Sequence, residues 1–127
     1  MEQVIIFQWA RMCSGRYPEL AFMFAIPNGA KLPYVKNSNG HRYSPQAIKL
    51  LAEGLLPGAS DIFLPAARGG WNGLFLELKH GKNTLSDKQQ AFSEAMLSFG
   101  YLALACWEAD QAIATIEDYL EGRYKRT

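Results

Sequence analysis

Residues 73–79 read Gly-Leu-Phe-Leu-Glu-Leu-Lys, and this short stretch decides how the rest of the chain is interpreted. Four of its residues are large and apolar, which is typical of a strand that is covered on both faces of a sheet. Side chains alternate along a strand, so Glu77 and Lys79 are expected on the same face. Burying an acid and a base together is unfavourable unless they are paired or take part in chemistry.

A second acid stands at the start of the preceding apolar run, residues 61–64. The Arg68-Gly69-Gly70 segment between the two runs is typical of a chain reversal, which predicts an antiparallel hairpin. Asp61 and Glu77 are sixteen residues apart, yet the hairpin would let them face each other across the strands.

The composition is that of one soluble globular domain spanning residues 1–127, with 49% hydrophobic and 20% charged residues. No apolar run approaches the roughly 20 residues that a membrane span needs. The start of the chain lacks the basic and apolar regions of a signal peptide, so a cytoplasmic protein is expected. Cys13 and Cys106 are interpreted as buried thiols.

The net charge of +1 does not by itself indicate a nucleic-acid partner, but the charges are unevenly distributed. Residues 1–50 carry six Lys/Arg and two acids, whereas residues 51–127 carry seven Lys/Arg and ten acids. A basic N-terminal half is suited to phosphate contacts, although ordinary solvated charge explains the counts equally well. The polar segment 30–43, rich in basic and aromatic residues, is interpreted as a long loop that either binds phosphates or is simply flexible.

The other elements are expected from apolar periodicity and capping signals, and together they predict a small α/β fold. The order is helix, strand, helix, two-stranded hairpin, helix, strand, helix, and the last strand is parallel to the hairpin because a helical crossover precedes it. The expected elements are a helix over 2–14, a buried strand over 21–26, a helix from Ser44-Pro45 to Gly54, a helix from Ser86 to Gly100, a strand over 101–107 and a helix capped by Asp110 and ended by Gly122.

Two carboxylates and a lysine on neighbouring strands are the parts of a divalent-metal site for phosphodiester hydrolysis. Asp61 and Glu77 would supply oxygen ligands to Mg²⁺ or Mn²⁺, and the backbone carbonyl of Leu78 would add a third. Lys79 would lie beside the metal, where it would orient water or stabilise charge on the phosphate.

These residues resemble the signature of the PD-(D/E)XK nucleases, and the order of elements is similar to the restriction-endonuclease-like core of that superfamily. More narrowly, the chain resembles a stand-alone VRR-NUC domain of the phage and bacterial type. A triplet of acid, any residue and lysine is weak evidence, but the ordered set over nearly the whole chain is specific. That set is Glu2-Gln3 with Trp9-Ala10-Arg11, Ile26 to Gly29, Lys49 with Gly54, Pro57 to Asp61, Gly73 to Lys79, Leu85-Ser86 with Gln89, Gly100-Tyr101 and Tyr119-Leu120.

The resemblance implies a role for each matching residue. Asp61 and Glu77 match the metal-binding acids, and Lys79 matches the catalytic lysine. Gln89 matches a glutamine near the active site, although its spacing from Ser86 also fits a capping box. Glu2 matches the acid of the first helix that completes the metal site, although an acid in a first turn also suits the helix dipole.

The resemblance further implies a structure-specific DNA endonuclease that cuts four-way (Holliday) junctions as a homodimer. The first helix, with apolar Val4, Ile5, Ile6, Phe7 and Trp9, is a candidate dimer surface. Two alternatives stay open: a nuclease acting on flaps, nicks or duplex DNA, and a DNA-binding module in which Glu77 and Lys79 form a structural ion pair. The predicted DNA contacts are Asn28, Lys31, Lys36, Arg42, Lys49 and Lys82.

Overall fold

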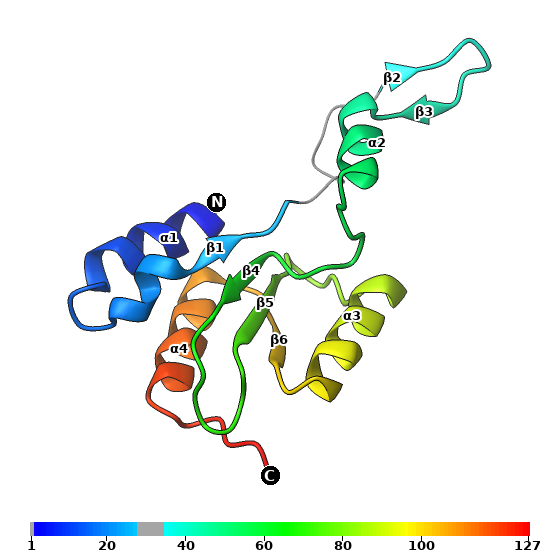
Figure 1. Cartoon of the computed structure of the whole chain (residues 1–127). Coiled ribbons are helices and arrows are strands. Elements are labelled where there is room, and N and C mark those ends of the chain that lie inside the picture. Colours follow the sequence, from blue (N-terminus) through cyan, green and yellow to red (C-terminus); the bar gives the residue numbers. More distant parts are fainter. Residues whose placement is uncertain (1, 28–34) are drawn as a thin grey trace.

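A four-stranded mixed sheet forms the centre of the computed structural model, which describes residues 2–27 and 35–127. The strand order is β1-β4-β5-β6 (Figure 1). Strand β5 runs antiparallel to β4 and β6 runs parallel to β5, as the sequence predicted, and β1 also pairs antiparallel with β4. The strands are β1 (Phe24–Ala25), β4 (Ile62–Leu64), β5 (Leu74–Leu78) and β6 (Leu102–Cys106).

Helices cover both faces of this sheet (Figure 1). Helices α1 (Glu2–Cys13) and α4 (Ala109–Leu120) pack against each other on one face, where the Cys106 thiol meets Thr115 of α4. Helix α3 (Asp87–Ser98) covers the other face, where the rings of Phe75 and Phe92 are 5.2 Å apart. Alternate residues of β5 therefore face α1 and α4 or face α3. The prediction of an α/β fold with helices on both faces is confirmed.

The predicted capping signals explain where two of the helices begin. Ser44 caps α2 (Pro45–Ala52) by accepting a hydrogen bond from the Ala47 N–H, and Pro45 occupies the first helical position. Ser86 and Gln89 form a complete capping box at the start of α3. None of the helices in the described part of the chain is long and apolar enough to cross a membrane.

Two expected elements differ from the structure. The apolar run 21–26 is not a buried strand, because its first residues belong to the 3₁₀ helix η1 (Pro18–Phe22) and only β1 remains extended. Pro18 opens η1, and β1 lies at the exposed edge of the sheet, where Phe24 is 50% exposed. Asp110 does not cap α4, because Glu108 is the N-cap residue and Asp110 lies in the first turn.

The segment interpreted as a long loop contains a small ribbon. Strand β2 (Val35–Lys36) pairs antiparallel with β3 (Arg42–Tyr43). The side chain of Asn37 builds the turn by accepting hydrogen bonds from the N–H groups of Asn39 and His41. The ribbon and α2 project away from the central sheet (Figure 1), so this basic segment forms an arm of the molecule.

Candidate active site

The hairpin of β4 and β5 brings Asp61 to the residues on either side of Glu77. Ile62 is the ladder partner of Leu76, and the Asp61 N–H also donates to the Leu76 carbonyl at 3.0 Å. Two residues of one strand thus oppose a single residue of the other, which is a β-bulge. The predicted hairpin is confirmed, but Asp61 is not a ladder partner of Glu77, because its backbone N–H bonds to Leu76 and its carboxylate bonds to the Leu78 N–H.

The carboxylate of Asp61 continues the hydrogen bonding of β5 beyond the end of β4. Its Oδ2 atom accepts the Leu78 N–H at 2.7 Å, a position that a backbone carbonyl would occupy in a longer ladder. The N–H and C=O of one residue in a strand point to the same edge, so the Leu78 carbonyl is directed to the side where Asp61 lies. The predicted carboxylate and carbonyl oxygens therefore gather at one end of β5.

Glu77 and Lys79 lie on the face of the sheet that α3 covers. Phe75 contacts Phe92 of α3. Glu77 and Lys79 follow Phe75 by two and four residues, so alternation along the strand places them on the same face. Glu77 is 4% exposed and Asp61 is 5% exposed, whereas Lys79 is half-buried. The backbone N–H of Lys79 donates to the Cys106 carbonyl at 2.8 Å, which extends the pairing of β5 and β6 to the lysine.

Gln89 combines the capping role with a remaining donor. Its Oε1 atom accepts the Ser86 N–H at 2.9 Å, which is the capping-box bond. A glutamine amide has both an oxygen acceptor and a nitrogen donor, so the Nε2 group is still able to donate to a substrate oxygen. The two interpretations of Gln89 are therefore compatible within one side chain.

Glu2 lies at the end of β5, but next to a residue that the sequence did not single out. Its Oε2 atom is 3.6 Å from His80 Nδ1, and His80 directly follows Lys79. The one feature of the sequence that could have pointed to His80 as a neighbour of the site is its position directly after Lys79. Among the residues that the structure describes, no three His, Cys, Asp or Glu side chains are grouped closely enough to hold a metal ion. A role for Glu2 as a ligand stays a prediction.

The donor set of Asp61, Glu77 and the Leu78 carbonyl fits a hard divalent cation. Mg²⁺ and Mn²⁺ prefer oxygen ligands, and Mg²⁺ commonly binds one or two carboxylates while keeping several waters. Both carboxylates are nearly buried, and in such surroundings a divalent cation interacts more strongly with its oxygen ligands than it does in water. Two protein carboxylates and one carbonyl therefore match such an ion without a third acid.

Gly58 sets the distance between the Asp61 segment and the start of α3. Its φ angle is +91°, a conformation that glycine adopts readily, and a Cβ atom there would lie 2.7 Å from the Lys88 backbone. The turn before Asp61 therefore rests directly on the first turn of α3, next to Gln89. A Pro-Gly pair such as Pro57-Gly58 is a signal for a turn, but it does not show which element the turn will contact.

The predicted DNA contacts lie in several surroundings. Lys36 and Arg42 are directly opposite each other in the exposed ribbon. Lys49 is in an exposed ion pair with Glu53, 3.8 Å away, and Lys82 is exposed in the loop after β5. Asn28 and Lys31 lie outside the described residues.

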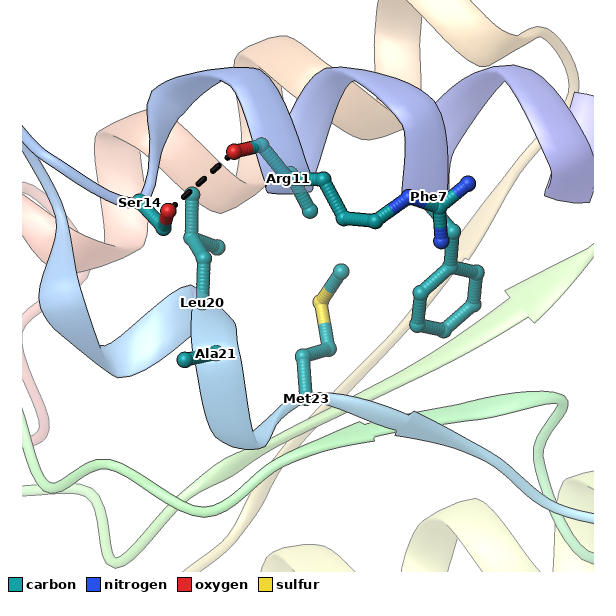
Figure 2. A pocket seen from close by; sticks show the side chains of 7 residues that line it. Phe7, Arg11, Ser14, Leu20, Ala21 and Met23 are labelled. Carbon is teal, nitrogen blue, oxygen red and sulfur yellow. Dashed lines mark hydrogen bonds between the residues drawn. The ribbon is translucent and has the colours of Figure 1, made fainter.

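A cavity of about 370 Å³ lies elsewhere, between α1, η1 and the start of β1. Figure 2 shows the Met23 side chain pointing into the space between Phe7 and Leu20, with Arg11 at its rim. None of the predicted site residues lines this cavity. The predicted site instead lies at the end of β5.

The comparisons with known proteins agree with this architecture. A solved structure titled "VRR_NUC domain protein" superimposes with a TM-score of 0.69 at 22% sequence identity, over 94% of this chain and 85% of that chain. The two chains share one fold. No protein-family model and no curated protein matched the sequence. The ordered motifs predicted the VRR_NUC fold, and the similarity to a protein of that name was found by comparing structures.

The hydrogen bond between Asp61 and Leu78 gives the first prediction. Asp61→Ala leaves the Leu78 N–H without its acceptor, so we expect urea denaturation to give a free energy of unfolding lower by about 1–3 kcal/mol than that of Asp61→Asn. Both variants remove the same charge, so their difference isolates the hydrogen bond. Asp118→Ala, which breaks only the exposed pair with Arg123, is the control. Equal stabilities of the two Asp61 variants would contradict this role.

Proposed function

We propose that this chain is a divalent-metal-dependent DNA endonuclease that hydrolyses phosphodiester bonds in branched DNA. The observation that carries the proposal is the arrangement at the end of β5. There, two nearly buried carboxylates adjoin a lysine in a chain with the VRR_NUC fold. Buried acids are costly in a purely structural role, and a phosphodiesterase site uses this combination of groups.

The metal is assigned to Asp61, Glu77 and the Leu78 carbonyl, with Glu2 as a further candidate ligand. When bound, Mg²⁺ or Mn²⁺ supplies positive charge that activates water and neutralises the phosphate. The protein contributes a fixed geometry: the bulge directs the Asp61 carboxylate, and the Leu78 N–H holds that carboxylate in place.

Lys79 and Gln89 are assigned to the substrate rather than to the metal. The ammonium group of Lys79 lies on the same face as Glu77, where it stabilises negative charge on the phosphate or orients the attacking water. The Nε2 group of Gln89 is a donor for a phosphate oxygen or water, while Oε1 is kept in place by its capping bond.

The projecting ribbon supports DNA contact away from the cleaved bond. Lys36 and Arg42 are directly opposite each other in the exposed β2–β3 ladder, so the ribbon presents two basic side chains together. Basic side chains of this kind bind the phosphates of the DNA backbone. An arm that binds phosphates outside the site suits a substrate with more than one DNA helix, and a four-way junction is the proposed substrate.

A substrate panel tests the activity. We expect wild-type protein with Mg²⁺ or Mn²⁺ to cut a four-way junction faster than matched flap, nicked or plain duplex DNA. Asp61→Asn and Glu77→Gln are expected to lower cleavage at least 100-fold because each removes a charged oxygen ligand. Equal rates on all substrates would favour the broader nuclease alternative. Cleavage at the wild-type rate by either variant would contradict the assignment of the site. DNA binding without cleavage by the wild-type protein would favour the non-catalytic DNA-binding module.

Lys79 is tested by separating metal binding from chemistry. In Lys79→Met the side-chain volume is kept and the charge is lost, so we expect cleavage to fall while the heat of Mn²⁺ binding in isothermal titration stays close to wild type. Lys125→Met, which changes an exposed lysine near the end of the chain and outside the predicted site and DNA contacts, is the matched control. Loss of Mn²⁺ binding in Lys79→Met would indicate a structural lysine instead.

The proposed homodimer requires a surface on α1, and the structure reduces the candidate residues. Ile6 is fully buried in the core, and Phe7 and Trp9 are partly buried against it. Val4 and Ile5 remain 49% and 46% exposed. Exposed apolar side chains on one helix are a common feature of interfaces between copies, and two copies would present two sites to the opposed strands of a junction.

Solution mass tests this surface. We expect light scattering to give the mass of two 14.2 kDa chains for the wild type and of one chain for the double variant Val4→Asp, Ile5→Asp, because a charge cannot be buried at an apolar interface. Phe99→Asp, at an exposed position after α3, is the control and should stay dimeric. A monomeric wild type would contradict the proposed assembly.

A further inference from the structure

We propose that Trp107 stacks on an unpaired nucleobase next to the cleaved phosphate. The inference rests on the proposed function, and it names the feature of the DNA that the site selects. Trp107 follows directly after the edge strand β6 and is 37% exposed, so part of its side chain is available to a ligand.

The strand register places Trp107 beside Lys79. Strands β5 and β6 are parallel, and Leu78 is the partner of Cys106. The hydrogen bond from the Lys79 N–H to the Cys106 carbonyl is the one expected when Lys79 and Trp107 are the next pair of the ladder. Paired residues of neighbouring strands lie about 4.8 Å apart and share a face. The backbone of Trp107 therefore lies one strand spacing from that of the lysine assigned to the phosphate.

Two hydrogen bonds hold Trp107 in place despite its exposure. The indole Nε1–H donates to the Asn83 carbonyl at 2.9 Å, and the backbone N–H donates to Gln111 Oε1 at 2.7 Å. The first bond ties the ring to the loop after β5, and the second ties the backbone to α4. A ring that is fixed before the substrate arrives loses little conformational entropy on binding.

The neighbouring charge is suited to a nucleotide. Lys82 precedes Asn83 in the same loop and is exposed. An aromatic platform together with a cation that binds the adjacent phosphate is the combination with which proteins hold unpaired nucleic acid. In a continuous duplex the bases stack on one another, whereas a branch point, flap or nick offers a base with a free face. Stacking on Trp107 thus provides a preference for interrupted DNA.

Binding measured in EDTA tests the inference without requiring cleavage. The probes are a four-way junction with one unpaired nucleotide at the branch and a fully paired duplex of the same length, both followed by fluorescence anisotropy. We expect Trp107→Leu to weaken junction binding about tenfold or more and duplex binding less than about twofold. Trp107→Phe, which keeps a stacking ring but loses the bond to Asn83, should stay within about threefold on both. Phe99→Leu is the control at an exposed aromatic distant from Lys79.

Each outcome supports or overturns the inference. Selective loss in Trp107→Leu, with retention in Trp107→Phe, supports stacking. Equal loss in both variants on both DNAs overturns it, because that pattern shows that Trp107 only positions the loop. Unchanged discrimination by Trp107→Leu, in a wild type that cuts junctions, overturns the inference alone. A wild type that neither binds nor cuts DNA overturns the proposed function and this inference together.

Discussion

The hydrogen bond from the Leu78 N–H to the Asp61 carboxylate is the interaction on which the candidate site depends. It replaces a main-chain bond at the point where the β4–β5 ladder ends, and the bulge at Asp61 makes it possible. Because the N–H and carbonyl of Leu78 point to the same edge of β5, two of the three proposed metal oxygens lie on one side of the strand. Glu77 is the residue between the two main-chain groups that Asp61 contacts, and its position is set by the regular pairing of β5 with β6.

Much of this arrangement was predictable because the signals are local. The alternation of Glu77 and Lys79 along an apolar strand gave their shared face, and the Gly69-Gly70 reversal gave the hairpin. The bulge was not predictable, because no residue type marks it and it is visible only as a shift of one residue in the hydrogen bonds. Glu2 contacts His80, and Gly58 packs closely against the backbone of Lys88. Both contacts join residues that are far apart in the sequence, so the sequence alone carried no signal for them.

The incorrect predictions of secondary structure have equally specific causes. The run 21–26 is apolar enough for a buried strand, but Pro18 nucleates η1 and the chain reaches the edge of the sheet only at Phe24. The β2–β3 ribbon has two residues in each strand, which is too short for a period to appear, and its turn depends on the side chain of Asn37. The ribbon gives the basic segment a defined shape, which places Lys36 beside Arg42.

The central claim is that Asp61, Glu77 and the Leu78 carbonyl hold one divalent ion at the end of β5. The most direct measurement is anomalous scattering from crystals of the protein grown with saturating Mn²⁺. The account predicts one strong peak bounded by these three oxygens, with Lys79 and Gln89 alongside, and loss of that peak in Asp61→Asn crystals. A peak that is bound elsewhere, or a peak that persists unchanged in the variant, would contradict the account.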